Sequence, residues 1–368
     1  MEIIKFNGDP VTELQDGEIV NGLRRKTWIE RYREAGEFTF VGEVNSGLRD
    51  ILSIGSIVSH TETPEIMIVE NHEISEEPDE DPELIITGRS FETYFNERIV
   101  GSNQSYPSSG GLTEYTLASD DSGEQVKDLI EDHILAANLV DDDDALSYVV
   151  VSTDLPNTYT QSARTIARGP LYSRVLELLE VDDLGIRSLR PHQFAPGGSA
   201  GDDIRVVIHD GNDLTDSVFL SYFTGAIEKA DYLWSNKGLK NCAYVHGKWV
   251  DTLVDSSATG YDRRMMLVDA SDLDEAYSSA PSGGTRTAIV TAMQVRGAQA
   301  LAAQRTTALI KAEQCASVTR ACYRRRFDIG DVVTVLGNFG EEAAMRISEY
   351  VEIEDEEGYN GYPTLAVI

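Results

Sequence analysis

The segment Gly197-Gly-Ser-Ala-Gly201 has the spacing of the Gly-x-Ser-x-Gly motif that presents a nucleophilic serine in hydrolases. That motif needs a strand before the serine and a helix directly after it. Here the segment lies in a Gly- and Pro-containing loop, Gln193–Asp203, and a predicted strand, Ile204–His209, follows it. The residues around the motif therefore predict a loop and not a nucleophile elbow, although the spacing fits.

Other residue types that bind metals or transfer protons are present without the required spacing. The six histidines, at positions 60, 72, 133, 192, 209 and 246, are scattered, and no pair has the separation of a zinc site. The acidic run Asp141–Asp144 lacks the Asp-x-Asp-x-Asp-Gly pattern of a calcium loop, so we interpret it as a solvated loop. Cys242, Cys315 and Cys322 are expected to be small buried apolar residues. We predict no catalytic residue, no metal site and no cofactor.

Charge is the extreme property of the composition. The chain has 63 Asp and Glu against 31 Lys and Arg, a formal net charge of −32, and only eight of the basic residues are lysine. Such a charge destabilises a compact state by self-repulsion unless salt screens it. We therefore predict a halophilic source, with an acidic mesophilic protein as the alternative. The same charge argues against stable nucleic-acid binding, which needs basic patches.

The elements that must position any site are mostly strands. Residues 1 to about 100 alternate apolar and polar side chains in short runs, including a hairpin with an acidic tip at Glu76–Glu83. Helices are expected at 90–98, at 122–140, with Ser122 and Gln125 in a capping box, and after Gly169-Pro170. A β-meander is expected over Asn241–Val268, and a long helix over Thr285–Ala316.

The last fifty residues read as strand, loop, strand, hairpin and strand, with Asn360-Gly361 as the expected hairpin turn. The chain as a whole is predicted to be a β-dominated α+β protein with several domains. No apolar run is long enough to span a membrane, and no signal peptide is expected.

Four landmarks, in order along the chain, resemble the hub proteins at the tail tip of long-tailed phages and related archaeal tailed viruses. They are Trp28–Phe40, then Leu84–Val100 with its Gly-Arg-Ser, then Lys240–Gly247 followed by Arg263–Asp272, and finally Asp328–Val335 with Arg346-Ile347. The resemblance covers nearly the whole chain. The arginine run Arg324–Arg326 and the acidic run Asp141–Asp144 are departures from the family pattern.

The resemblance implies two tube-like β-barrel domains with helical or α+β insertions, assembled into a ring. On this basis residues 1–100 form a first β-barrel hub domain and 101–203 an α+β insertion domain. Residues 204–284 form a second β-rich hub domain, 285–316 a long helix and 317–368 a C-terminal β-segment.

The implied function is structural. A homotrimer in the virion would close the tail tube at the tail tip, or baseplate, and link it to receptor-binding fibre or spike proteins. It would contact the tape measure protein and let genomic DNA pass transiently during ejection and host cell entry. Arg324, Arg325, Arg326 and Arg346 are candidate subunit or tube contacts; the alternative is that they balance nearby acids.

Two other functions stay open at this point. A tail-associated hydrolase of the host envelope is compatible with the many carboxylates, although no motif supports it. A receptor- or glycan-binding module is suggested by the aromatic stretch Tyr222–Trp249, although aromatic residues in a β-meander are more often part of a core.

Overall fold

The computed structural model describes most of the 368-residue chain. The described residues are 1–7, 15–44, 47–76, 81–101, 115–135, 145–146, 148–155, 160–161, 163–190, 204–221, 223, 225–235, 238–255, 258–274, 277, 279–302, 307–314, 323–337, 342–356 and 358–367. The chain divides into two compact units. Unit 1 comprises Met1–Lys229 and Glu313–Ile368, and unit 2 comprises Ala230–Ala312.

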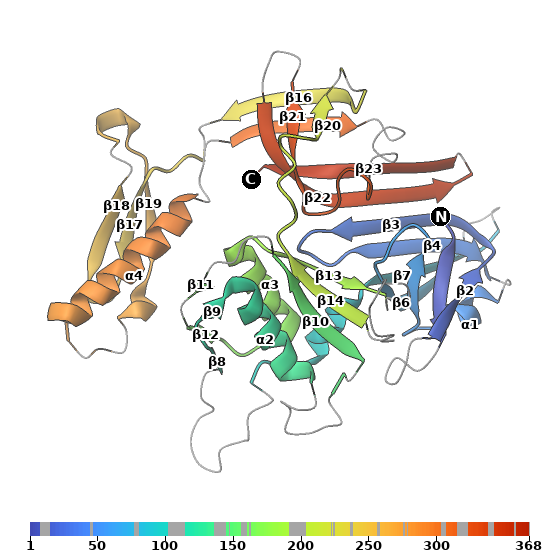
Figure 1. Cartoon of the computed structure of the whole chain (residues 1–368), viewed down its shortest axis with the longest axis horizontal. Helices are drawn as coiled ribbons and strands as arrows, with labels where there is room; N and C mark the ends of the chain where they lie inside the picture. The colour runs from blue at the N-terminus through green and yellow to red at the C-terminus, as the bar shows by residue number, and fades with distance from the viewer. Residues whose placement is uncertain are drawn as a thin grey trace, which may run out of the picture. The chain divides into compact units, whose positions relative to one another are not determined.

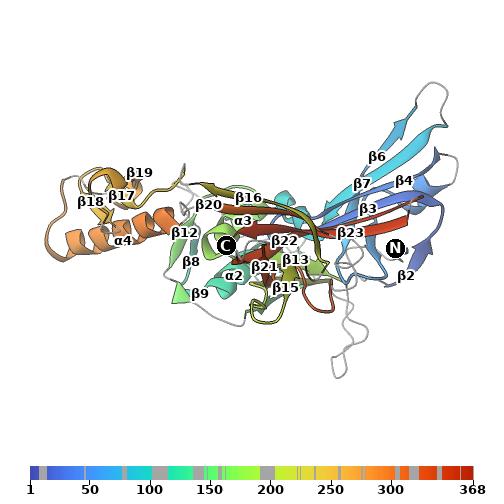
Figure 2. The same cartoon turned by 90° about the horizontal axis from the view of Figure 1, so that it is seen from above.

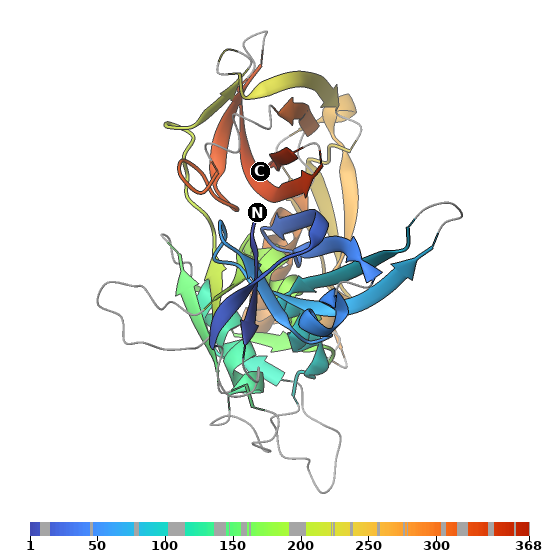
Figure 3. The same ribbon diagram turned by 90° about the vertical axis from the view of Figure 1, so that its right-hand side faces the viewer.

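A large sheet organises unit 1. Its order is β15-β21-β22-β3-β4-β7-β6-β5-β1-β2, and β23 also pairs with β22. The strands are β1 (Ile3–Asn7), β2 (Gln15–Val20), β3 (Leu23–Arg31), β4 (Glu37–Glu43), β5 (Ile57–His60), β6 (Met67–Ser75), β7 (Glu83–Ser90), β15 (Phe219–Ser221), β21 (Val332–Leu336), β22 (Glu342–Asp355) and β23 (Gly358–Val367). The short helix α1 (Leu48–Ile51) joins β4 to β5. Figure 3 shows the blue N-terminal strands next to the red C-terminal strands.

The N-terminal strands curl around one apolar core. Trp28, Phe38, Phe40, Met67 and other side chains from β1, β3, β4, β5, β6 and β7 form a single buried cluster. They do so because alternate residues of a strand point to the same face, and here that face is apolar. Among the described residues, the strand pairings do not close the sheet into a barrel.

The hairpin β6–β7 extends beyond the rest of the sheet (Figure 2). Its register shifts between Val69 and Asn71, the signature of a β-bulge, which bends a strand. Gly88 lies opposite this point, where a Cβ atom would stand 1.8 Å from the Ile68 carbonyl oxygen. The absence of a side chain at Gly88 therefore allows β6 to cross close to β7.

Unit 1 also contains an α/β layer. A three-stranded sheet, β10 (Val149–Asp154), β14 (Ile204–His209) and β13 (Gly185–Leu189), packs with α2 (Ser122–Ile134), α3 (Leu171–Asp182) and the 3-10 helix η2 (Phe91–Glu97). Two small ladders, β8 (Tyr115–Leu117) with β12 (Arg164–Ile166) and β9 (Asp120–Asp121) with β11 (Thr160–Gln161), lie beside them. Their buried side chains form a second core that includes Phe91, Phe95, Leu129 and Val175.

The long strand β22 connects these parts of unit 1. Along one edge it pairs with β23 from Met345 to Asp355. Along the other edge it pairs first with β21 and then, from Glu349 to Glu354, with β3. The C-terminal segment is thus hydrogen-bonded directly into the N-terminal sheet.

Unit 2 is a two-layer module. Strands β18 (Asp251–Asp255), β17 (Cys242–His246) and β19 (Met265–Asp269) form a sheet in that order, and α4 (Gly283–Ala302) covers one of its faces (Figure 1). The ribbon β16 (Ile227–Ser235) with β20 (Thr307–Gln314) leads into and out of the module. Short 3-10 turns, η4 (Gly260–Asp262) and η5 (Ser271–Leu273), flank β19.

Two polar and steric details fix unit 2. The buried Asp274 accepts hydrogen bonds from the backbone N–H groups of Lys248, Trp249 and Val250, which holds the turn between β17 and β18. A Cβ atom at Gly297 of α4 would lie 2.6 Å from Val245 Cγ2, so this glycine lets the helix approach the sheet.

The structure confirms several sequence predictions. The β-dominated α+β class is correct, as are the helices beginning near Ser122 and Leu171, the strand Ile204–His209 and the hairpin that joins β6 to β7. Cys242 is buried. Cys315, Cys322, Asp141–Asp144, and Gly197–Gly201 lie outside the described residues. No helix among the described residues is long and apolar enough to cross a membrane.

Three predictions about elements are wrong. The helix predicted to Ala316 ends at Ala302, and Thr307–Gln314 is a strand; adjacent β-branched threonines at 306 and 307 favour that change. The predicted meander is not one, because β17 and β19 pair in parallel. The last hairpin turns between Asp355 and Gly358, so Asn360-Gly361 lies inside β23.

The predicted capping box of α2 is also absent. Asp121 is the N-cap residue, without a side-chain cap, and the Gln125 side chain donates instead to the Ala118 carbonyl at 2.6 Å. The division of the chain into five segments at 1–100, 101–203, 204–284, 285–316 and 317–368 remains a prediction, apart from the helix end corrected above.

Candidate functional site

Carboxylate and histidine side chains do not gather into a metal centre in this structure. No group of three or more His, Cys, Asp or Glu among the described residues is placed to hold a metal ion. The chemistry instead concentrates in two polar clusters inside unit 1. Each cluster contains one of the arginines singled out by the sequence.

Arg324 lies at the centre of the first cluster, which we call the Arg324 cluster. Its guanidinium contacts Glu30 of β3 and, at 3.2 Å, Glu352 of β22, and it donates to the Glu62 carbonyl oxygen at 2.6 Å. Arg324 has a φ of +57°, a left-handed backbone conformation that costs free energy in a non-glycine residue. In this conformation its side chain reaches both acids and the Glu62 carbonyl oxygen.

Glu30 is almost completely buried and accepts hydrogen bonds from several side chains besides Arg324. Tyr323 Oη donates at 2.5 Å, Thr63 Oγ1 at 2.6 Å and Trp28 Nε1 at 3.1 Å. Burial opposes ionisation of Glu30, but the charge of Arg324 and the hydrogen bonds from Arg324, Thr63 and Tyr323 outweigh it, so the pKa of Glu30 is lowered. Glu30 is therefore a carboxylate.

Glu352 is the second acid of the cluster and has the opposite tendency. Burial raises its pKa, with Glu30 adding to the effect and Arg324 opposing it. Tyr359 of β23 donates a hydrogen bond to it. His60 Nε2 lies 3.4 Å from Glu352 Oε2 without forming a hydrogen bond; since burial lowers the pKa of His60 to about 3, this contact is not an ion pair.

Two more acids, Glu65 and Glu92, are buried near this cluster. Glu92 Oε2 accepts a hydrogen bond from Ser188 Oγ at 2.6 Å, and burial raises the pKa of Glu92 to about 7. Burial and the charge of Glu30 also raise the pKa of Glu65. Both acids therefore keep their protons to a higher pH in the folded chain than an exposed glutamate does.

Arg346 of β22 lies in the second cluster. Its Nη2 donates to Asp183 Oδ2 at 2.8 Å, and its Nη1 donates to the carbonyl oxygens of Asp210 at 2.6 Å and Gly330 at 3.1 Å. Its guanidinium also lies 4.5 Å from the ring centre of Tyr32, a cation–π contact. Arg346 thus joins β22 to the α/β layer.

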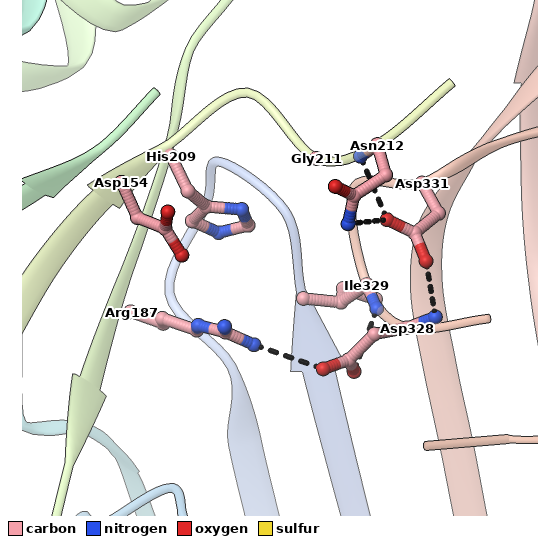
Figure 4. A pocket seen from close by; sticks show the side chains of 8 residues that line it. All are labelled: Asp154, Arg187, His209, Gly211, Asn212, Asp328, Ile329 and Asp331. Atoms are coloured by element: carbon pink, nitrogen blue, oxygen red, sulfur yellow. Dashed lines mark hydrogen bonds and ion pairs between the residues drawn. The ribbon is translucent and has the colours of Figure 1, made fainter. Parts of the chain in front are cut away.

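A polar cavity of about 60 Å³ lies beside this second cluster (Figure 4). Its lining residues are Asp154, Arg187, His209, Gly211, Asn212, Asp328, Ile329 and Asp331. Asp328 pairs with Arg187 at 3.1 Å, and Asp331 accepts from the backbone N–H groups of Asn212 and Asp328. These two carboxylates are already engaged in holding the loops together.

His209 is buried at this cavity, and its Nε2, like the Nε of Arg187, has no hydrogen-bond partner among the described residues. Burial, followed by the charges of Arg187 and Arg346, lowers its pKa well below the ordinary value. The imidazole is therefore neutral and is not suited to act as a general acid near neutral pH. The contacts of both clusters hold distant segments of unit 1 together.

The four arginines predicted as contacts separate into two pairs. Arg324 and Arg346 bind carboxylates of their own chain, as the alternative interpretation expected. Arg325 and Arg326 are exposed, and the role of all four arginines in subunit or tube contacts remains a prediction.

The sequence interpretation missed the buried acids. A signal was present, because Trp28 and Glu30 are two residues apart in β3, as are Tyr350 and Glu352 in β22. Period-two alternation places each acid on the same face as a large buried aromatic residue.

The match to known families covers almost the whole chain. A family model described as Siphovirus ReqiPepy6 Gp37-like protein matches residues 9–364. No curated protein matches the sequence.

Solved structures share the fold at low sequence identity. A tail protein from Neisseria meningitidis is 13% identical with a TM-score of 0.56, over 99% of this chain and 95% of that chain. The 43 kDa tail protein of prophage MuSo2 from Shewanella oneidensis is 14% identical with a TM-score of 0.55, over 100% and 98%. Prophage tail protein gp18 from Listeria monocytogenes is 11% identical with a TM-score of 0.51, over 95% and 90%.

The Arg324 cluster predicts a large loss of stability when its cation is removed. In Arg324→Gln, Glu30 and Glu352 would remain buried without a positive charge, so the free energy of unfolding should fall by about 3–5 kcal/mol. Arg325→Gln, at an exposed neighbour, should change it by less than about 0.5 kcal/mol. Chemical denaturation of both variants in high salt measures the difference, and equal effects would contradict the cluster's role.

Glu92 predicts that stability decreases as the pH rises. Because its pKa is about 7 when folded and 4.5 in an exposed glutamate, the folded state binds more protons, and stability is lost as the pH rises from about 4.5 to 7. The loss should approach about 3 kcal/mol.

The variant Glu92→Gln should remove this component, while Glu97→Gln, at an exposed residue of the same η2 segment, should retain it. Unfolding free energies at pH 5 and pH 8 for the three proteins test the sign. A Glu92→Gln protein with the same pH dependence as wild type would show that the side chain does not titrate in this way.

Proposed function

The chain belongs to the Siphovirus ReqiPepy6 Gp37-like protein family, and on this premise we propose that it is a structural hub protein at the tip of a viral tail. The observation that supports this best is the length of the match, since 99% of the chain aligns with 95% of a solved tail protein. A shared fold alone does not assign a function. The argument for the hub role therefore also uses the chemistry and charge of this chain.

The chemistry of unit 1 suits a scaffold. Its polar clusters are internal, and the arginines in them bind acids of their own chain. The long strand β22 and these clusters link the N-terminal sheet, the C-terminal segment and the α/β layer, which would make unit 1 stiff enough to close a tube. We therefore propose a non-enzymatic role.

The assembly we propose is a homotrimeric ring in which the curved sheet of unit 1 supplies tube-like walls. The ring would join the tail tube to distal fibre or spike proteins, contact the tape measure protein and allow genomic DNA to pass. The net charge of −32 suits such a passage, because an acidic wall does not retain DNA. Exposed Arg325 and Arg326 are the proposed contacts with the tube or a neighbouring subunit.

The ring predicts a defined particle in purified protein. In 2 M KCl we expect particles of three times 40.5 kDa that appear as rings in negative-stain electron microscopy, with mass photometry giving the stoichiometry. Arg325→Glu/Arg326→Glu should dissociate them without lowering the free energy of unfolding of the chain. A wild-type protein that stays monomeric at all concentrations would overturn the trimer.

The charge also predicts a salt requirement. Because self-repulsion is screened at molar salt, the unfolding temperature should rise by about 5–10 °C or more between 0.1 M and 2 M KCl, which corresponds to a few kcal/mol. Scanning calorimetry at the two salt concentrations measures this. Equal unfolding temperatures would contradict adaptation to a halophilic setting.

A further inference from the structure

Among the residues that the structure describes, the sheet of unit 2 is covered on one face only. On the covered face, Ala243 and Val245 of β17 pack in one buried cluster with Ile289 and Met293 of α4. Successive residues of a strand point to opposite faces, so the residues between these buried positions define a second, open face. That face carries an apolar row.

Three large side chains lie directly across from one another in this row. Tyr244 of β17 is paired with Leu253 of β18 and with Leu267 of β19, and the exposed fractions are 39%, 42% and 70%. Met265, two residues before Leu267, is 48% exposed. Scattered exposed apolar residues are ordinary, but a contiguous set on one sheet face marks an interaction surface.

The next row along the same face is charged. His246 is paired with Asp251 of β18 and with Asp269 of β19, and all three are exposed. Asp251 accepts hydrogen bonds from Tyr244 Oη at 2.8 Å and His246 at 2.7 Å, and Asp269 accepts from Ser271. Hydrogen bonds from Tyr244 and His246 lower the pKa of Asp251, and those from Ser271 lower the pKa of Asp269, so this end of the face stays negative.

Unit 2 differs from the rest of the chain in charge. Residues 230–312 contain nine Lys and Arg and eight Asp and Glu, a net charge of +1. The rest of the chain therefore has a net charge of −33, and the two parts together give −32. The open apolar face is therefore on the part of the chain that does not repel other acidic proteins. An acidic tail protein that carries a local basic segment can therefore approach this module without the repulsion that unit 1 imposes on acidic proteins.

We propose that this open face docks a partner protein through a segment that carries aliphatic side chains next to a lysine or arginine. The aliphatic side chains would cover Leu253, Tyr244 and Leu267, and the cation would lie over Asp251 and Asp269. A glycan fits less well, because Leu253, Leu267 and Met265 offer no polar groups to hydroxyls. A second copy placed face to face would bring more carboxylates, and no lysine or arginine of these rows, to Asp251 and Asp269.

The probe is a labelled synthetic peptide of alternating leucine and lysine, compared with a leucine–glutamate peptide of the same length. Anisotropy is measured with the full chain in 2 M KCl, which screens attraction to unit 1. Wild type should bind the lysine peptide about two- to fivefold more tightly than the glutamate peptide, because exposed ion pairs contribute about 1 kcal/mol or less. Such a ratio corresponds to about 0.4–1 kcal/mol.

Two matched variants separate this face from exposed apolar residues in general. Leu253→Ser/Leu267→Ser should weaken binding of the lysine peptide at least about tenfold. Ile54→Ser/Val181→Ser, at residues of unit 1 that are 65% and 63% exposed, should leave it unchanged. Asp251→Asn/Asp269→Asn should reduce the preference for lysine over glutamate. Thermal unfolding of each variant checks that the chain remains folded.

Several results would overturn the proposal. Binding that survives Leu253→Ser/Leu267→Ser, or that falls equally in the control pair, would show that the peptide binds elsewhere. Self-association in sedimentation that is lost in Leu253→Ser/Leu267→Ser would identify a second copy as the occupant instead. This docking proposal rests on unit 2 alone. If it fails, the proposed trimeric ring is unaffected and is tested separately by mass photometry and electron microscopy.

Discussion

The ion pairs of Arg324 are the interaction on which the architecture of unit 1 depends. This one guanidinium lies between Glu30 of β3 and Glu352 of β22, residues that are more than 300 positions apart in sequence. Burying two acidic side chains is costly unless a cation and hydrogen bonds compensate, and here one arginine contacts both. Arg346 plays a parallel part between β22 and the α/β layer. The C-terminal segment is therefore fixed to the rest of unit 1 by charge as well as by β-pairing.

Local patterns in the sequence predicted the local elements. The alternation within residues 1–100 and the helix signal at Ser122 are properties of neighbouring residues, and a strand at Glu37–Glu43 and a helix at Ser122–Ile134 are present. The errors occurred where pairing with a distant strand determines the secondary structure. An alanine-rich sequence favours helix, yet Thr307–Gln314 pairs with β16 as a strand. Asn360-Gly361 is a strong turn signal, yet the register of β22 with β23 places it within a strand.

The polar clusters were harder to predict, because their members come from distant segments. The sequence marked Arg324 as unusual. It binds its own chain because Glu30 and Glu352 lie close together, and the register between β3 and β22 is what brings them together. The net charge of −32 also does not show how charge is divided between the two units. This division becomes visible only once the boundaries of unit 2 are known, and it separates a strongly acidic scaffold from a nearly neutral module with an open apolar face.

A double-mutant cycle between Arg324→Gln and Glu30→Gln tests the central claim most directly. The free energy of unfolding is measured in high salt for wild type, the two single variants and the double variant. The cycle gives the interaction free energy between the two side chains, separate from the effect of each substitution on its other contacts. A buried pair that joins the two ends of the chain should give a coupling of at least about 2 kcal/mol. A coupling below about 0.5 kcal/mol would show that the pair contributes no more than an exposed salt bridge, and would contradict this account.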